Sequence, residues 1–414
     1  MHILLLIAGE AMFVRSRVIQ ALEAKKGHFS QYQGGVSERA AGLDETLMHI
    51  ASLSRAEVEA RLAATGVARP GALPTDEHDQ MHTVVVHFGA RWNTHEEARA
   101  WAKRVLLGQP TFAVDGSQIP QSHDFSIPVA AIQIGWFENP HAPFRPYVKD
   151  VFFEVLTPDE LAAYEEATDA SDQTLGSSAF PGILVNLRRF QGECQRIIAY
   201  MQEHAAHEPK PLCFFDGSLT LSFARHLSPQ LRQEYLRSLV TMLRTSQSTR
   251  VPVIGYVDSS YARDLVTMLT LFSGTSTPAH LNDGILLQPY MRWGDRSLVY
   301  WCARDDEILP LYETEVGRIA FVYLKTSTTA LPARIEFPGW LLEDWARMER
   351  ILDLIRAECV VGNGYPYVLE TADAVAVISA EDRQRFYAVF QQFAEREGLT
   401  LRYSRKARSK AIRR

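Results

Sequence analysis

Cysteine is scarce in this chain, and long apolar runs are missing. Four cysteines occur among 414 residues, far apart and without a CxxC pair, at positions 194, 213, 302 and 359. A zinc site or a disulfide framework is therefore not expected, and a reducing cytoplasm is the simpler setting. The apolar stretch near the start is interrupted by Glu10 and has no basic segment before it. It is too short to span a membrane, so we expect a buried helix or strand there and no membrane partner.

The chain also lacks a large excess of charge of either sign. Its 43 basic and 49 acidic residues leave a net charge of −6, so the molecule is not a polycation. Any binding of nucleic acid must then come from local basic surface. The hydrophobic fraction of 46% and the charged fraction of 22% are typical of a globular protein. The length fits two or three domains, or one elaborated α/β domain with an extension.

Three regions follow from the local patterns. Residues 1–107 are expected to form a mostly helical extension. Ser54 and Glu57 form a capping box, Thr94 opens a later helix, and residues 68–76 are a predicted loop. Residues 108–400 are the predicted main domain. Residues 401–414 form a basic tail, which is either solvated or a salt-sensitive contact to nucleic acid, with docking of a partner also open.

The main domain reads as alternating strands and helices. Strands are predicted over residues 111–119, 127–136, 148–156, 211–219 and 251–257, and helices over 182–204 and 229–246. Hairpin strands followed by crossover units predict an α/β fold, with a mixed β-sheet flanked by helices. This order matches the ribonuclease-H-like fold, in which the first strand, the first helix and the fourth strand each contribute an acid.

Two of the predicted strands end alike, in an acid followed by Gly-Ser. The first carries Asp115 before Gly116 and Ser117, and the second carries Asp216 before Gly217 and Ser218. A glycine lets a substrate backbone approach closely, and each serine is a candidate contact to a phosphate of DNA. A single Asp-Gly-Ser is a common turn, but two on apolar strands are a more specific signal.

A third acid is expected on the helix between these strands. Glu193 lies on or beside the apolar face of that helix, and a solvated position at the helix edge is its alternative. Glu154 is the reserve candidate. Phosphodiester cleavage by two divalent ions, roughly 4 Å apart, needs several carboxylates. Hard oxygen ligands favour Mn²⁺ or Mg²⁺ over zinc.

Several segments resemble the NurA family of nucleases. They are residues 112–120 and 212–219, which hold the two Asp-Gly-Ser strands, and residues 127–135, 254–260, 294–297 and 364–373. The resemblance implies a ribonuclease-H-like core and Mn²⁺-dependent cleavage of DNA. It also implies a homodimer that works with a HerA-type hexameric ATPase in DNA end processing. The family's acids match Asp115, Glu193 and Asp216, and its late Tyr-Pro motif falls on Tyr365.

One position departs from that pattern. Where better-known members have a histidine eight residues after the tyrosine, this chain has Asp373. The acid is either a fourth metal ligand or the sign of a degraded site, and a helix N-terminal cap is its structural alternative. Elsewhere, Arg296 is either a phosphate contact or part of a salt bridge, and Glu336 either functional or structural. Asp258 is expected to cap the next helix.

Three functional hypotheses remain. The leading one is a metal-dependent DNA nuclease in which Asp115, Glu193, Asp216 and Asp373 hold two Mn²⁺ or Mg²⁺ ions. In it, Tyr365 contacts the substrate near the cut. The alternative is a nuclease-inactive clamp for DNA, or a scaffold that docks the ATPase, on the same fold. A third hypothesis is a ribonuclease-H-like enzyme that acts on RNA or on hybrids.

Overall fold

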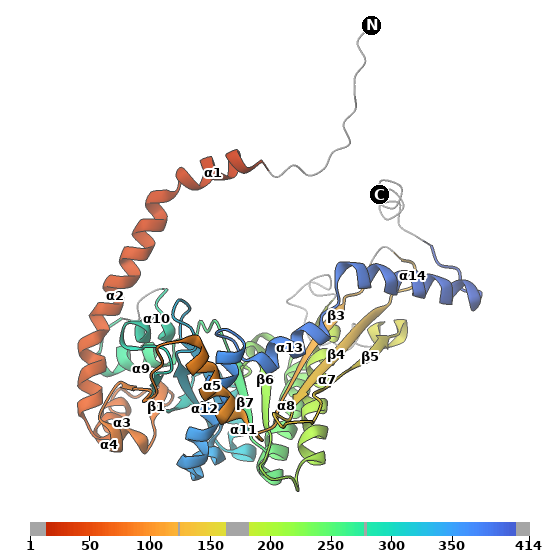
Figure 1. Ribbon diagram of the computed structural model, residues 1–414. Coiled ribbons are helices and arrows are strands. Elements are labelled where there is room, and N and C mark those ends of the chain that lie inside the picture. Colours follow the sequence, from red (N-terminus) through yellow and green to blue (C-terminus); the bar gives the residue numbers. More distant parts are fainter. Residues whose placement is uncertain (1–13, 123–124, 163–181, 277–279, 403–414) are drawn as a thin grey trace.

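The protein is built around one large mixed sheet (Figure 1). The computed structural model describes residues 14–122, 125–162, 182–276 and 280–402. The apolar start and nearly all of the basic tail lie outside these ranges, so both remain predictions. Within the described residues, no helix is long and apolar enough to cross a membrane.

The sheet has eleven strands. Their bounds are β1 Gly71–Pro74, β2 Val85–Val86, β3 Thr111–Ile119, β4 Ala130–Asn139, β5 Val148–Leu156, β6 Leu212–Asp216, β7 Val253–Val257, β8 Arg296–Ser297, β9 Tyr300–Ala303, β10 Ile319–Leu324 and β11 Ala333–Pro338. The main path runs in the order β1-β9-β10-β11-β7-β6-β3-β4-β5, and β8 pairs with β10 and β2 beside it.

Helices cover both faces of this sheet. Their bounds are α1 Arg15–Glu23, α2 Lys26–Ser52, α3 Arg55–Ala63, α4 Glu77–Met81, α5 His95–Leu106, α7 Ile183–Glu203, α8 Pro229–Thr249, α9 Asp264–Ser273, α10 Asp283–Leu287, α11 Leu309–Val316, α12 Trp345–Val361, α13 Tyr367–Ala376 and α14 Ala380–Arg396. Short 3₁₀ helices run over Ser222–His226, Gln288–Tyr290 and Gly339–Glu343.

Five strands form the predicted ribonuclease-H-like core. In the order β5-β4-β3-β6-β7, β4 pairs antiparallel with both β3 and β5, whereas β3, β6 and β7 are parallel neighbours. Helix α7 connects the third strand of this core to the fourth, and α8 connects the fourth to the fifth. The predicted fold class is therefore confirmed.

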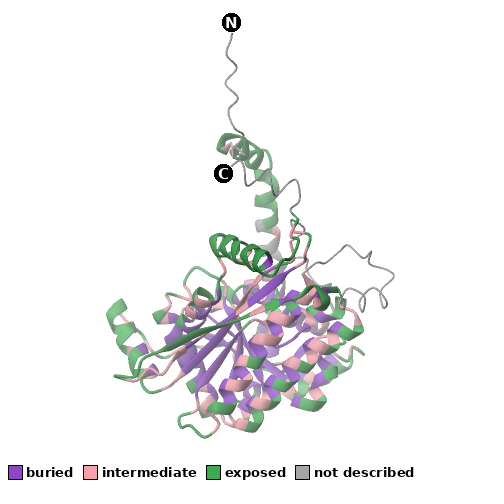
Figure 2. Ribbon diagram, turned by 90° about the vertical axis from the view of Figure 1, so that its right-hand side faces the viewer, coloured by how far each residue is buried: buried purple, intermediate pink, exposed green. Residues whose placement is uncertain are grey.

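Alternating side chains of β3 supply two hydrophobic cores. Phe112 and Val114 belong to the core that contains α7, whereas Ala113 belongs to the core that contains α12 and α13. Successive side chains of a strand point to opposite faces, so this alternation assigns each later residue of β3 to a face. Figure 2 shows the buried strands in the middle of the molecule, beneath helices with exposed outer sides.

The region before residue 108 joins the same sheet. β1 pairs with β9 and β2 pairs with β8, so part of the predicted loop at residues 68–76 is a strand instead. That prediction was wrong because its partner lies more than two hundred residues away. The capping box of Ser54 and the N-cap of Thr94 are both confirmed. The domain boundary at residue 107 stays a prediction.

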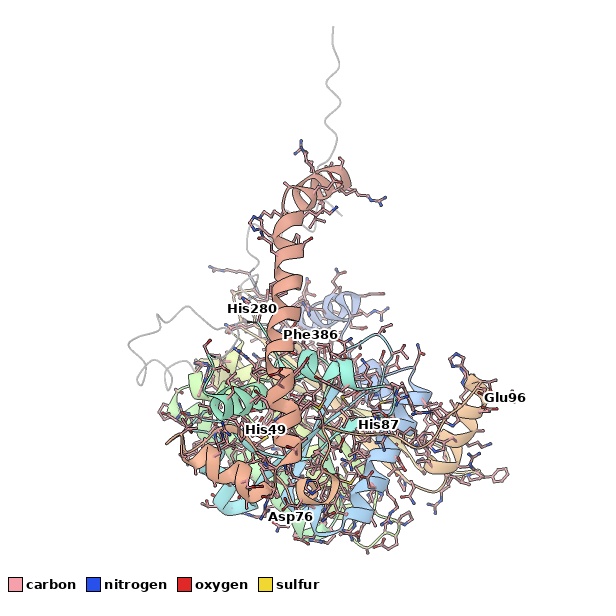
Figure 3. The ribbon with its side chains drawn as sticks, turned by 90° about the vertical axis from the view of Figure 1, so that its left-hand side faces the viewer. His49, Asp76, His87, Glu96, His280 and Phe386 are labelled. Atoms are coloured by element: carbon pink, nitrogen blue, oxygen red, sulfur yellow. The ribbon has the colours of Figure 1, made fainter. Side chains whose placement is uncertain are left out.

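Helix α2 extends away from the sheet (Figure 3). Leu43, Leu47 and Ile50 anchor its C-terminal part in the core. Nearer its start, Phe29 and Tyr32 are exposed. The helix extends away from the sheet where buried side chains give way to exposed ones.

Candidate active site

Asp115 and Asp216 lie side by side at the ends of neighbouring parallel strands. β3 and β6 are in register up to the pair Val114 and Phe215, which directly precede the two acids. Paired residues of a parallel sheet point to the same face, so both carboxylates face the layer of α12 and α13. The two Asp-Gly-Ser strands thus bring their acids together, as their sequence predicts.

Asp373 joins them from the helix that packs over this face. Helix α13 contacts β3 and β4, and the carboxyl group of Asp373 lies close enough to Asp115 to raise the pKa of Asp115. Because α13 begins at Tyr367, Asp373 lies beyond its first turn. The alternative of an N-terminal helix cap is therefore wrong, and the exposed Asp373 completes a group of three carboxyl groups.

The grouping of acids changes their protonation. The pKa of Asp115 is raised to about 6, first by burial and then by the charges of Asp216 and Asp373. The pKa of Asp216 is also raised, first by desolvation, and again by the negative charge of Asp373. Both shifts show like charges held close together at a partly dry site, which is where a divalent cation relieves the repulsion.

Glu193 reaches the site from the opposite face of the sheet. It lies on α7, is 5% exposed, and is paired with Arg189 one turn earlier. Gly116 makes room for both side chains. A Cβ built on Gly116 would lie 2.5 Å from the Cγ of Arg189 and 2.5 Å from the Oε1 of Glu193. This glycine serves the approach of Glu193, a role that the sequence did not reveal.

The buried carboxyl group of Glu193 is coupled to the other acids. The pKa of Glu193 is raised to about 8. Burial raises it most and the charges of Asp115 and Asp216 also raise it, whereas Arg189 lowers it. A solvated helix edge, the alternative for Glu193, does not describe this position. The acid instead lies close enough to both aspartates to feel their charges.

Tyr365 borders the acids. Its hydroxyl donates a hydrogen bond of 3.4 Å to Oδ1 of Asp216, and its ring packs edge-on against Tyr256 at 5.2 Å between centroids. Desolvation and the nearby negative charges of Asp216, Asp258 and Asp115 raise the pKa of the Tyr365 hydroxyl. The phenol thus stays protonated and acts as a donor.

Asp258 is a site residue that sequence reasoning missed. The predicted helix cap is wrong, because the following helix α9 begins only at Asp264. Asp258 directly follows β7, in which Tyr256 is paired with Asp216, and its negative charge raises the pKa of Asp216. The missed signal was its position at the carboxyl end of a strand parallel to β6.

The two serines hold protein groups. Ser117 Oγ accepts a hydrogen bond of 3.1 Å from the amide of Ile378, just after α13. Ser218 Oγ donates to the carboxylate of Glu336 at 2.7 Å. Both therefore fix chain segments around the acids. Their contact with DNA stays a prediction.

Arg296 is not available to DNA in this structure. It is 2% exposed and ion-paired with Glu77, at 2.6 Å, and with Glu349. The salt-bridge alternative is confirmed, and the prediction of a phosphate contact is wrong. Glu336 is likewise buried in an ion network, and Glu154 lies on β5 opposite Ile132, two strands away from β3.

The acids fit divalent ions by the chemistry of their donors. They are all hard oxygen ligands, and their mutual repulsion is of the kind that a cation relieves. Among the residues that the structure describes, no group of three or more acidic, histidine or cysteine side chains is already arranged to hold a metal. Asp373, which lies near Asp115, and Glu193, which is paired with Arg189, are the further acids that would hold such an ion.

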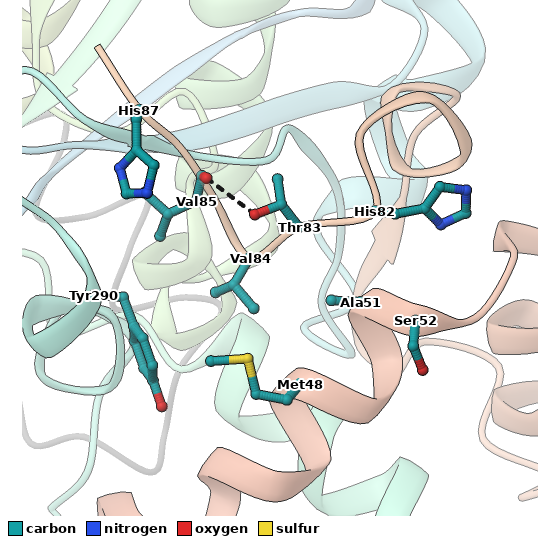
Figure 4. A pocket seen from close by; sticks show the side chains of 9 residues that line it. All are labelled: Met48, Ala51, Ser52, His82, Thr83, Val84, Val85, His87 and Tyr290. Atoms are coloured by element: carbon teal, nitrogen blue, oxygen red, sulfur yellow. Dashed lines mark hydrogen bonds between the residues drawn. The ribbon is translucent and has the colours of Figure 1, made fainter. Parts of the chain in front are cut away.

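A separate hollow lies far from this chemistry in the fold. It lies between α2 and residues 82–87 (Figure 4), and its volume is about 310 Å³. The nine side chains that line it include those of His82, His87 and Tyr290, and none of the nine is acidic. We assign it no part in the site.

The fold and the acids define a ribonuclease-H-like protein with a carboxylate site across β3, β6 and α7. The sequence model of the NurA domain matches residues 109–378, more than half of the chain. The chain therefore belongs to the NurA family, a family of nucleases. A search of curated proteins finds no match.

Solved structures give the same assignment of the fold. The crystal structure of the NurA nuclease from Sulfolobus solfataricus matches with a TM-score of 0.53 at 10% identity, over 93% of this chain and 98% of that chain. A crystal structure of NurA with manganese matches with a TM-score of 0.40 at 11% identity, over 69% and 89% of the two chains. The first of these likenesses shows the shared fold.

Proposed function

We propose that the protein is a Mn²⁺- or Mg²⁺-dependent deoxyribonuclease that hydrolyses phosphodiester bonds, using two metal ions. The observation that carries this proposal is the meeting of Asp115, Asp216 and Asp373 at one edge of a ribonuclease-H-like sheet. Membership of the NurA family supports a nuclease in general, and the grouping of these three acids supports this metal chemistry.

Each residue has a defined task in the proposed reaction. Asp115, Asp216, Asp373 and Glu193 would hold the ions. When bound, such ions activate water and stabilise the leaving oxygen of the phosphate. Gly116 leaves space for Glu193, and Arg189 forms an ion pair with that carboxyl group in the absence of an ion.

Tyr365 would orient the substrate. Its hydroxyl, which donates its one proton to Asp216 in this structure, lies at the edge of the acids and would redirect that hydrogen bond to a phosphate oxygen beside the cut. The Tyr365→Phe variant should keep the fold, because the ring still packs on Tyr256. We expect its kcat to fall by about tenfold or more, the loss of one transition-state hydrogen bond.

We propose further that the enzyme acts in the cytoplasm on DNA ends, as a homodimer, with a HerA-type hexameric ATPase. The resemblance to the family supports these partners. The buried, unpaired state of all four cysteines agrees with a reducing setting. Sedimentation of the protein, alone and with such an ATPase, tests both associations.

The decisive assay uses end-labelled single-stranded DNA, double-stranded DNA and an RNA–DNA hybrid, with Mn²⁺ or EDTA. We expect degradation of DNA with Mn²⁺ only, and none by Asp216→Asn. DNA binding without any cleavage would support the nuclease-inactive clamp. Preferential cleavage of the hybrid would support the third hypothesis instead.

A further inference from the structure

The segment that follows Asp216 is an unusually well-anchored turn. Strand β6 ends at Asp216, and Gly217 then adopts φ +135°, a conformation that favours glycine. The turn folds back across β7 at Gly255. A Cβ built on Gly255 would lie only 2.6 Å from the carbonyl oxygen of Gly217, so a glycine is needed below the turn as well as in it.

On the far side of β7, Glu336 holds this turn. In the sheet, Phe215 is opposite Gly255, and Gly255 is opposite Glu336 on β11. One carboxylate oxygen, Oε2, accepts hydrogen bonds from the amides of Leu219 at 2.7 Å and Thr220 at 3.1 Å. It also accepts one from the hydroxyl of Ser218 at 2.7 Å. The Thr220 hydroxyl donates to the other oxygen, Oε1, at 3.3 Å, so the turn directs four donors at a single buried acid.

The acid itself is fixed by an ion network. Arg334 donates to Oε1 of Glu336 at 2.7 Å and contacts Asp264 at 2.7 Å. Arg304 grips Asp264 with two hydrogen bonds, of 2.7 and 2.8 Å, and donates to the Thr220 hydroxyl at 2.9 Å. Burial alone would raise the pKa of Glu336, but the two arginines and Ser218 lower it. The arginines thus favour the ionised form of Glu336.

A network of this kind is costly to bury, and apolar residues of similar volume often serve a core as well. Here, however, one carboxylate oxygen of Glu336, Oε2, accepts hydrogen bonds from the chain that directly follows Asp216. We propose that Glu336 is a positioning residue for the active site, which sets the place of the Asp216 carboxylate by anchoring the turn of residues 217–220. This inference rests on the proposed function, in which Asp216 holds a metal ion.

The variants are chosen to separate anchoring from folding. Glu336→Gln removes the anion, and Ser218→Ala removes one donor without disturbing the buried arginines. Ser222→Ala is the matched control, since Ser222 also accepts from Arg304, at 2.9 Å, and donates to Asp306 but lies beyond the turn. If Glu336→Gln fails to fold, Ser218→Ala carries the test.

Three measurements are made on each purified full-length variant. They are the Mn²⁺ affinity without DNA, from the electron paramagnetic resonance signal of free Mn²⁺, kcat and KM for a DNA substrate, and hydrogen exchange of residues 217–220. We expect Glu336→Gln to lose about 10–100-fold in Mn²⁺ affinity and in kcat, with KM unchanged, as for residues behind metal ligands. Ser218→Ala should lose about 3–10-fold, because it removes one of the four donors to Glu336, and exchange of the turn amides should quicken in both variants.

Wild-type values in both variants, or equal losses in Ser222→Ala, overturn the inference. A rise in KM with unchanged kcat for Ser218→Ala also overturns it, since that is the behaviour of a DNA contact. If the wild-type protein neither binds Mn²⁺ nor cleaves DNA, the proposed function fails instead. The exchange data still decide whether Glu336 holds the turn, because they need neither metal nor substrate.

Discussion

Asp115 and Glu193 are two acids whose surroundings change their protonation. The pKa of Asp115 is raised to about 6, and that of Glu193 to about 8, from ordinary values of 3.8 and 4.5. Without metal, the folded protein therefore binds more protons than the unfolded chain between about pH 4 and pH 8. Stability then falls as pH rises, because folding raises these pKa values.

The first prediction concerns this pH dependence. In EDTA, the melting temperature of the wild-type protein should fall between about pH 4 and pH 8. Asp115→Asn cannot ionise, so it should lose the part of that fall below about pH 6 and be the more stable protein at pH 7. Melting curves over the pH series check this. A wild-type protein that becomes more stable from pH 4 to pH 8, relative to Asp115→Asn, contradicts the assignment.

At the scale of secondary structure elements, the sheet and α7 converge at Gly116. Sequence periodicity predicted β3 and β5 with the observed bounds and α7 within one residue at each end, because each carries its own apolar pattern. Other features depend on distant partners. The pairing of β1 with β9 and the place of Asp258 beside Asp216 were missed, and the salt bridge of Arg296 was one of two alternatives whose partner Glu77 was not predicted, since no local pattern encodes them.

The second prediction tests the convergence. Gly116→Ala places a Cβ against Arg189 and Glu193, which must turn away because both contacts are at 2.5 Å. We expect a stability loss of about 1–2 kcal/mol and a fall in cleavage rate of about tenfold or more. Gly89→Ala, which meets nothing within 4 Å, is the control. Melting curves and DNA cleavage rates are compared, and equal activity of the two variants would refute the role of Gly116.

At the scale of the whole molecule, the acids lie in a protein of modest net negative charge, −6. Repulsion among grouped carboxylates destabilises the folded state. A bound cation removes that repulsion and so stabilises the folded state. In the proposed function, the same repulsion that lowers stability without metal would favour binding of the ion. The stability of the fold would therefore depend on whether an ion is bound at the acidic cluster.

The third prediction follows from that link. At a Mn²⁺ concentration one hundred times its dissociation constant, binding should stabilise the protein by about 2.7 kcal/mol, roughly 3 °C in melting temperature for a chain of this size. Asp216→Asn should lose most of this shift, whereas Ser222→Ala should keep it. NaCl at matched ionic strength controls for non-specific salt effects. An equal shift for the wild-type protein and Asp216→Asn would show that the ion binds elsewhere.

The identity of residue 373 gives the most direct test of a carboxylate metal site. The initial rate of Mn²⁺-dependent cleavage of end-labelled linear DNA is measured for the wild-type protein, Asp373→Asn and Asp373→His. If Asp373 is a metal ligand, the wild-type protein cleaves, Asp373→Asn falls by roughly 100-fold or more, and Asp373→His keeps a substantial part of the rate. A wild-type protein that binds DNA but does not cleave it with Mn²⁺, or an Asp373→Asn variant as fast as wild type, would contradict that role.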